Sequence, residues 1–266
     1  MAGGDRNIWL RVGIGLGRVV DRGADIWLDP GAVRRALLEL QSVFPATHLE
    51  ISLSDVVGCA PTDGNWSAFL QGTGRWSELI AELSQAIGDA FRAPVAWGVG
   101  LPDPRVVAKS IGDESERGAL KAGLEIASFL RRLRESSLRF TVVQIADSDA
   151  AGIARAVAPI LKNSQLYQWA RVISVARMEH VPAWKGQAEA ILVRAAEPLA
   201  LEAAWRIGEP LAGGLGPSFW NGEWAESFQL PDRFSLYGEL PSEVTPKALV
   251  EAGRSLRSRM QRDRSD

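Results

Sequence analysis

Residues 140–161 read FTVVQIADSDAAGIARAVAPIL, and this stretch shows the repeating unit of the fold. It begins with the apolar run Phe140–Ile145, which is typical of a β-strand covered on both faces. A polar break follows, in which Asp147 or Asp149 can cap a helix. Apolar residues then recur at helical spacing as far as Leu161. A strand, a break and a helix in this order form one βα unit of a parallel sheet.

The same pattern recurs along all 266 residues. The runs that we predict as strands are Ile8–Ile14, His48–Leu53, Pro94–Val99, Phe140–Ile145, Val172–Ala176, Ala190–Val193, Leu211–Leu215 and Phe234–Tyr237. Helix signals lie between them, such as the capping pairs Asp29-Pro30 and Thr245-Pro246. Eight units of about 33 residues favour a single (βα)8 barrel over the alternative, an open doubly wound sheet. We expect the barrel over residues 1–253 and a polar, Arg-rich helix end or tail over residues 254–266.

Two segments fit this prediction less well than the others. Only 13 residues separate Ala176 from Ala190, which is short for a crossover between parallel strands. The run Leu211–Leu215 is rich in glycine, so it is either a strand or a loop.

Composition limits the functions that the chain can have. Its 30 basic and 32 acidic residues give a net charge of −2, so we expect no nucleic-acid partner and no anionic membrane surface. One Cys and two His leave little material for a metal site or a disulfide framework, so we expect no metal and no cofactor. We expect a small-molecule ligand, and leave open a protein partner or a homo-oligomer.

The sequence also bears on the compartment of the protein. The N-terminus lacks the apolar region of a secretory signal, and no stretch reaches about 18 uninterrupted apolar residues. The single Cys59 has no partner within the chain. Together these features predict a cytoplasmic protein.

Candidate site residues were sought where strands end, because the reacting groups of (βα)8 enzymes lie there. We predict Asp147 and His180 as catalytic residues, with Glu179 able to raise the pKa of His180. The residues that we predict to bind substrate are Arg18, Arg22, Asp103, Gln144, Arg177, Glu179, Arg194, Glu239, Trp184 and Trp220. For each charged residue the alternative is an ordinary solvated strand end, and for the tryptophans it is packing in the core.

Residues 94–149 suggest a family. They contain PVAWGVGLPDPRVVA, a long helix and then FTVVQIADSD, and this arrangement resembles the superfamily of uroporphyrinogen decarboxylase and cobalamin-independent methionine synthase. The stretches at 12–15, 48–50 and 234–240 are similar to other parts of these barrels. The resemblance implies a barrel that performs decarboxylation or methyl transfer on a small carboxylated or methyl-bearing substrate.

The chain departs from the family pattern at the residues that carry the family's reactions. Ala146-Asp147-Ser148 stands where the family has an Asp-Glu-Pro-like segment, so Asp147 is the one acid left there. The zinc-binding His and Cys of the methionine synthases have no counterparts, and Arg18 and Arg22 match the arginine-rich loop of the decarboxylases only in part. Two functions therefore stay open: a divergent, metal-free methyltransferase- or decarboxylase-like enzyme, or an inactive barrel that serves as a binding scaffold or subunit.

Overall fold

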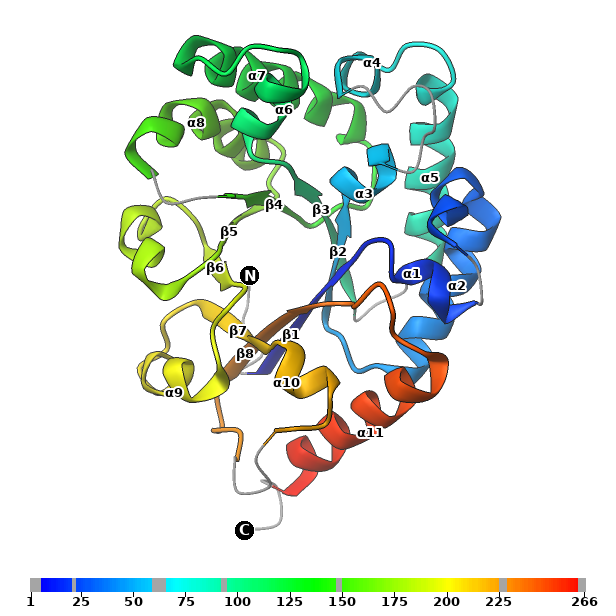
Figure 1. The fold of residues 1–266 in the computed structure, drawn as a ribbon, viewed down its shortest axis with the longest axis vertical. Coiled ribbons are helices and arrows are strands. Elements are labelled where there is room, and N and C mark those ends of the chain that lie inside the picture. The colour runs from blue at the N-terminus through cyan, green and yellow to red at the C-terminus, as the bar shows by residue number, and fades with distance from the viewer. Residues whose placement is uncertain are drawn as a thin grey trace.

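The computed structural model describes residues 6–20, 23–58, 66–91, 95–146, 150–224 and 229–262. Eight parallel strands pair in chain order, and β8 closes the barrel against β1 (Figure 1). The strands are β1 (Arg6–Val12), β2 (His48–Ser52), β3 (Ala96–Leu101), β4 (Phe140–Gln144), β5 (Ala170–Val175), β6 (Ala190–Val193), β7 (Leu211–Leu215) and β8 (Phe234–Glu239). The predicted (βα)8 barrel is confirmed.

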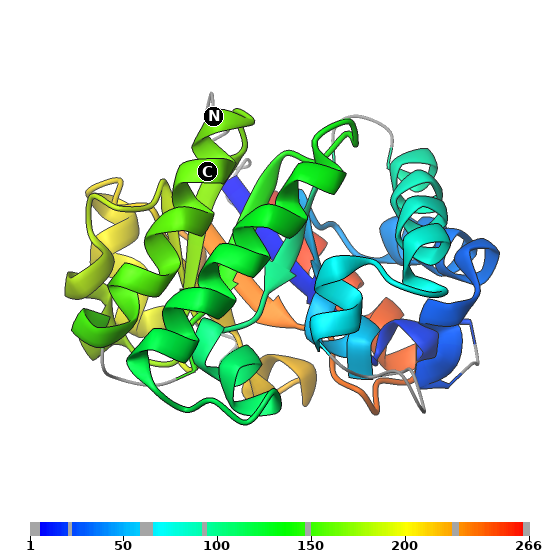
Figure 2. The same ribbon diagram turned by 90° about the horizontal axis from the view of Figure 1, so that it is seen from above.

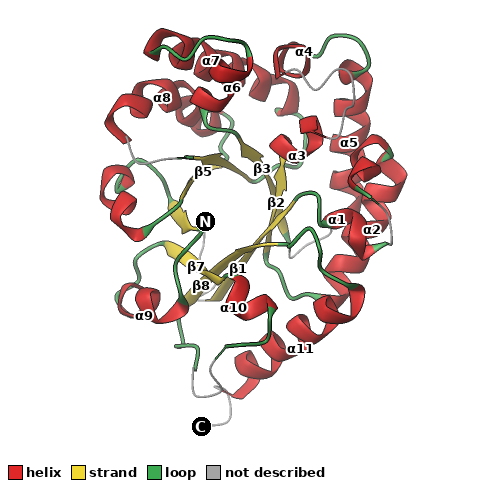
Figure 3. Cartoon of the chain, viewed as in Figure 1, coloured by secondary structure: helices red, strands yellow, loops and turns green. Residues whose placement is uncertain are grey.

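Helices surround the strands as an outer layer (Figures 2 and 3). They are α1 (Leu16–Val19), α2 (Pro30–Val43), α3 (Leu53–Gly58), α4 (Trp66–Gln71), α5 (Trp76–Ala90), α6 (Pro104–Ser110), α7 (Glu116–Phe129), α8 (Ala150–Leu166), α9 (Pro198–Arg206), α10 (Pro217–Trp220) and α11 (Pro246–Arg262). The described residues also contain three 3₁₀ helices: η1 (Ala24–Leu28), η2 (Leu130–Leu133) and η3 (Met178–Trp184). Among the described residues, no helix has the length and apolar character needed to cross a membrane.

The two doubtful segments both take their place in the barrel. The short crossover from β5, which ends at Val175, to β6, which begins at Ala190, contains η3 rather than an α-helix, which is how 14 residues suffice. The glycine-rich run at 211–215 is strand β7, and Gly214 adopts a φ of +94° that residues with a side chain rarely adopt.

Two of the predicted helix starts have the expected capping contacts, whereas Asp147 and Asp149, predicted to cap the helix after Ile145, lie outside the described residues. The Asp29 side chain accepts a hydrogen bond from the Ala32 N–H at 2.9 Å, so it caps α2. The Thr245 hydroxyl accepts one from the Ala248 N–H at 3.2 Å at the start of α11. This last helix continues to Arg262 and buries Leu256, so residues 254–262 belong to a packed helix.

Apolar residues form two separate cores. The larger core fills the space between strands and helices, and the smaller one fills the barrel interior. Within the interior, Trp9, His48, Phe140 and Tyr237 form what we call the aromatic layer. The rings of Trp9 and His48 stack with centroids 3.9 Å apart, and Phe140 meets Trp9 edge-on at 4.9 Å. Gly98 on β3 leaves the room that the Phe140 ring occupies.

Candidate functional site

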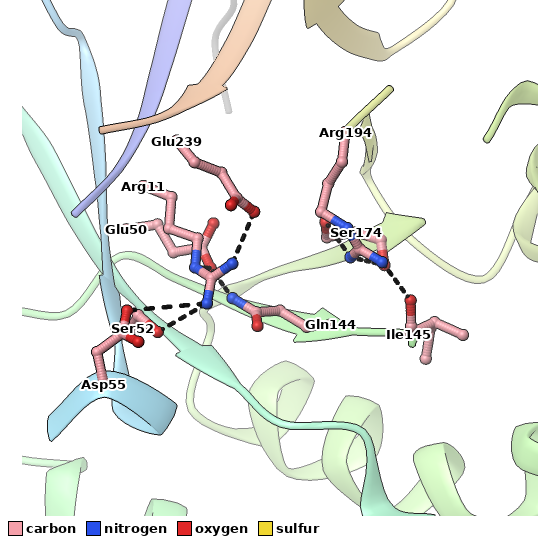
Figure 4. Close-up of polar contacts among 9 residues, drawn as sticks. All are labelled: Arg11, Glu50, Ser52, Asp55, Gln144, Ile145, Ser174, Arg194 and Glu239. Carbon is pink, nitrogen blue, oxygen red and sulfur yellow. Dashed lines mark hydrogen bonds and ion pairs between the residues drawn. The ribbon is translucent and has the colours of Figure 1, made fainter. Parts of the chain in front are cut away.

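The barrel interior changes from apolar to polar toward the carboxyl ends of the strands. Alternate residues of a strand face the same side, so the interior positions that follow the aromatic layer form the next layer. We call this the polar layer; it consists of Arg11, Glu50, Ser52, Gln144, Ser174, Arg194 and Glu239 (Figure 4). The strand registers place Arg11 opposite both Glu50 and Glu239, and Gln144 opposite Ser174. (βα)8 enzymes carry their active sites at this end of the barrel.

Arg11 connects the side chains contributed by β1, β2 and β8. Its guanidinium donates hydrogen bonds to Glu239 Oε1 at 2.6 Å and to Ser52 Oγ at 2.9 Å. Carboxylate oxygens of Glu50 and Asp55 each lie 3.9 Å from it. Burial lowers the pKa of Arg11, but the attraction of Glu50 and Glu239 outweighs this effect and raises the pKa above its ordinary value. Arg11 therefore stays charged and holds three acidic groups around one cation.

Glu50 is the most deeply buried acid of this cluster, with 1% of its surface exposed. Burial raises the pKa of Glu50 from 4.5 to about 7, although Arg11 and the hydrogen bond from Gln144 act in the opposite direction. Gln144 Nε2 donates that bond to Glu50 Oε1 at 2.6 Å. The other oxygen, Oε2, is buried and has no hydrogen-bond partner among the described residues. Glu50 is thus an acid that exchanges its proton near neutral pH.

Glycine on β3 makes the contact between Glu50 and Gln144 possible. These two side chains come from β2 and β4, and β3 lies between them in the sheet. A methyl group on Gly100 would overlap Glu50 Oε1 and lie 2.9 Å from Gln144 Nε2. The absence of a side chain at position 100 therefore lets the side chains of non-adjacent strands meet.

Arg194 forms a second cationic position in the polar layer. Its guanidinium donates to Ser174 Oγ at 3.1 Å, to the Ser174 carbonyl at 3.3 Å and to the Ile145 carbonyl at 2.7 Å (Figure 4). Across the described part of the chain, no Asp or Glu forms an ion pair with it. Neutral partners fix its position, and Glu50 attracts it without forming an ion pair, so its charge remains available to a bound anion.

Buried polar atoms without partners concentrate here. Among the described side chains five such atoms occur, and three belong to Arg11 (Nε), Glu50 (Oε2) and Tyr237 (the hydroxyl). Buried polar atoms are normally paired, so this clustering points to a place where a bound molecule supplies the missing partners. No group of three His, Cys, Asp or Glu side chains within the described ranges is arranged to hold a metal ion.

Three of the predicted substrate-binding residues lie in the polar layer: Gln144, Arg194 and Glu239. Asp103, which follows β3, instead makes contacts that join parts of the fold. It is 2% exposed, caps α6 by accepting from the Arg105 N–H at 2.8 Å, and also accepts from the Ala146 N–H at 3.0 Å. Asp103 thus joins the segments that follow β3 and β4.

The remaining predicted residues lie away from the polar layer or outside the described residues. Arg18 on α1 is exposed, and the exposed pair Arg177 and Glu179 is held together at 3.6 Å. His180 Nε2 lies 3.6 Å from the same Glu179 carboxylate, so these residues form a cluster of their own. Arg22 and Asp147 lie outside the described residues.

The two predicted tryptophans pack into the protein. Trp184 in η3 is 1% exposed and belongs to the core between strands and helices. Trp220 in α10 stacks on Phe44 with ring centroids 5.7 Å apart and donates to the Leu215 carbonyl at 3.1 Å. Their large apolar rings fill space between outer elements, so they do not form a wall of the polar layer.

Sequence reasoning missed Arg11, Glu50, Ser52, Ser174 and Tyr237. All lie inside the predicted strands, whereas we looked for reacting groups in the segments that follow the strands. The sequence did contain a signal for these residues, namely a charged residue within an otherwise apolar strand, as in IWLRV or HLEIS. Such a residue needs a polar partner when it is buried in the interior. Aligning the alternate positions of all eight strands would have brought these residues together.

Comparison with known proteins confirms the fold and goes no further. No family model matches the chain, and no curated protein matches it either. The spore coat polysaccharide biosynthesis protein spsE of Bacillus subtilis aligns over 97% of this chain and 69% of its own, with 13% identity and a TM-score of 0.50. A structure described as native KDPGal covers 96% and 95% at 12% identity (TM-score 0.41), and a cage designed from fused symmetric oligomeric domains covers 97% and 75% at 12% (0.46). At 13% identity, the likeness to spsE shows a similar fold alone.

Proposed function

We propose that the protein is an enzyme that acts on a small carboxylated substrate in the polar layer, with Glu50 as its acid and base. The observation that carries this proposal is the Glu50 carboxyl itself. It is buried at the catalytic end of a (βα)8 barrel, exchanges its proton near neutral pH, and has one oxygen without a partner. A carboxyl kept in this state suits proton transfer to or from a substrate.

The other residues of the polar layer have distinct roles in this proposal. Arg194, which is held by neutral hydrogen-bond partners, binds a carboxylate of the substrate. Arg11 lies beside Glu50 and retains 17% side-chain exposure, so it is the group that an incoming anion meets near the buried acid. In this proposal the Arg11 side chain shifts toward the bound anion, and the substrate then reaches the Glu50 carboxyl. Gln144 fixes the orientation of the Glu50 carboxyl.

Decarboxylation is the reaction of the resembled superfamily that these groups support best. The bond between the substrate carbon and its carboxylate breaks, CO2 leaves, and the electron pair stays on the substrate. Glu50 then gives its proton to that carbon and is reprotonated from solvent. The reaction draws on an arginine for binding and an acid for protonation, and both are present in the polar layer.

The proposal is tested with defined carboxylates. Malonate is the binding probe, and release of CO2 from acetoacetate and oxaloacetate is compared with release in the absence of protein. We expect Arg194→Gln to weaken malonate binding by about 10- to 100-fold, the effect of losing a charged hydrogen-bonding partner. Glu50→Gln should leave binding within a few-fold and lower the decarboxylation rate by at least about 100-fold.

Arg177→Gln is the matched control for Arg194→Gln. Arg177 also follows a strand, but it is exposed and its ion-pair partner is Glu179 outside the polar layer. Its substitution should change neither malonate binding nor turnover. If Arg177→Gln and Arg194→Gln have equal effects, the assignment of the polar layer as the substrate site is wrong.

A binding scaffold is the second candidate function, and one observation favours it. A hollow of about 840 Å³ lies on the outer wall of the barrel, between α5 and η2 with the residues that follow it. Ser77, Ser84 and Gly88 line one side, and Arg132 and Ser136 line the other. If none of the tested carboxylates raises the Tm of the wild-type protein or is decarboxylated, the scaffold function takes precedence.

A further inference from the structure

The hydroxyl of Tyr237 is a buried polar group that Ser174 affects without giving it a hydrogen bond of normal geometry. Tyr237 lies on β8 in the aromatic layer, opposite Trp9, and is 1% exposed. Glu239, two residues further along the strand, belongs to the polar layer. The phenol is close enough to Glu50, Glu239 and Arg11 to interact electrostatically with all three. Its ring thus packs with the aromatic layer while its hydroxyl lies at the boundary with the polar layer.

This hydroxyl makes no hydrogen bond of normal geometry. Ser174 lies near enough to affect the phenol, but burial and the acids Glu50 and Glu239 dominate and hold the pKa of Tyr237 well above its ordinary value of 10. The phenol therefore keeps its proton and remains a donor at every physiological pH. A phenylalanine would fill the same space without burying an unpaired donor, so packing alone does not account for a tyrosine here.

We propose that Tyr237 is a second catalytic residue, whose hydroxyl donates a hydrogen bond to a substrate oxygen that gains negative charge during the reaction. This inference rests on the proposed function of the polar layer and makes its substrate class narrower. An oxygen that gains charge when CO2 leaves is a carbonyl oxygen β to the departing carboxylate. The substrate is thus a β-keto acid or a compound with an equivalent electron acceptor.

The electrons and protons balance with the residues present. When the carbon–carboxylate bond breaks, its electron pair forms a carbon–carbon double bond and the carbonyl oxygen becomes an enolate oxygen. Tyr237 stabilises this oxygen by a hydrogen bond and keeps its own proton throughout. Glu50 then protonates carbon, and the carbonyl group is restored. A neutral hydrogen-bond donor that is already in place in a buried site, before the charge develops, lowers the activation barrier to forming the enolate.

Tyr237→Phe separates the catalytic role from a structural one. Because the hydroxyl makes no hydrogen bond of normal geometry and Ser174 affects it only weakly, we expect the variant to have a Tm within about 1 °C of the wild type or above it. We expect its decarboxylation rate to fall by about 100- to 1,000-fold, the loss typical of removing one such donor. Binding of malonate breaks no bond and places no new negative charge on an oxygen, so it should stay within about threefold of wild type.

The second tyrosine of the chain supplies a matched control. Tyr167 is half-buried beside Trp169, with ring centroids 5.0 Å apart, and precedes β5, so it lies at the end of that strand opposite the polar layer. Tyr167→Phe should leave the rate unchanged. A Tyr237→Phe variant that loses about 2–4 °C in Tm and keeps its full rate would show a purely structural hydroxyl and overturn the inference.

A spectroscopic readout does not depend on turnover. With only two tyrosines, carbon-13 labelling of the phenol carbon gives two NMR signals, and Tyr237→Phe identifies the one from Tyr237. Oxalate, a planar analogue of an enolate, should shift the Tyr237 signal and leave that of Tyr167 in place. If malonate binds through Arg194 but oxalate binds without moving the Tyr237 signal, the proposed function stands and this inference fails. If no carboxylate binds, both fail.

Discussion

The aromatic layer and the polar layer of the barrel interior are built from the same strands, yet they treat buried polar groups in opposite ways. His48 and Glu50 lie two residues apart on β2, and burial favours the neutral form of each. It lowers the pKa of His48 to about 4 and raises that of Glu50 to about 7. His48 nevertheless has partners in the fold: its ring stacks on Trp9, and its Nδ1 lies 2.9 Å from the Thr47 hydroxyl.

In the polar layer, by contrast, some buried polar atoms have no hydrogen-bond partner. Glu50 and Arg11 each have a buried atom without a partner, and so does Tyr237 of the aromatic layer, whose hydroxyl lies at the boundary with the polar layer. Complete pairing is typical of residues that stabilise a fold, whereas unpaired buried groups cost stability and persist where function requires them. The difference between the layers teaches that one strand can serve stability with one inward residue and chemistry with the next.

The largest expected effect tests the role of the aromatic layer in stability. Phe140→Ala removes a fully buried ring that contacts Trp9 and His48, so it should lower the free energy of unfolding by about 3–5 kcal/mol. Urea denaturation measures this change. Phe140→Leu, which keeps most of the apolar volume, should cost clearly less. A cost below about 1 kcal/mol for Phe140→Ala would mean that the aromatic layer is not the stabilising part of the interior.

Glu50→Gln should have an effect that depends on pH. Unfolded Glu50 ionises near pH 4.5 and folded Glu50 near 7, so between these values the folded state binds more protons. The wild type therefore loses stability as the pH rises through this window, by about 3 kcal/mol in all. The variant lacks this contribution. Relative to wild type, it should gain about 3 kcal/mol between pH 4 and pH 8.

Urea denaturation at both pH values measures that gain. His48 contributes in the opposite direction, because its folded pKa lies below its unfolded one and stability is lost as the pH falls from 6.5 toward 4. Both proteins carry His48, so its contribution cancels in the difference between them. A difference that stays constant from pH 4 to pH 8 would contradict a raised pKa for Glu50.

The smallest expected effect compares two glycines of β3. Gly100→Ala places a methyl group against Glu50 and Gln144, whereas Gly98→Ala places one against the Phe140 ring. Each should cost about 1–3 kcal/mol through overpacking. We expect only Gly100→Ala to alter the pH profile of turnover, because only that methyl group disturbs the hydrogen bond on Glu50. If both variants changed the pH profile of turnover equally, the pH dependence could not be attributed to the contact of Glu50 with Gln144 in the polar layer.

The fold could be predicted from the sequence because most strands are largely apolar runs between identifiable caps and breaks. Ala190–Val193 and Leu211–Leu215 were predicted with the bounds that the structure has. The site was harder to predict, because a strand residue reveals which way it faces only when the register between strands is known. Arg11 was therefore assigned to an apolar strand, while Arg18 and Arg177, which follow strands, were assigned to the site.

Gly100 has a consequence for how the protein can diverge. Position 100 is joined to positions 50 and 144 by space, since any side chain there occupies the place where the Glu50 and Gln144 side chains meet. The three positions are therefore not free to vary one at a time. In descendants of this sequence, a larger residue at position 100 should appear together with replacements at 50 and 144, so that covariation among the three would record the loss or the change of the reaction.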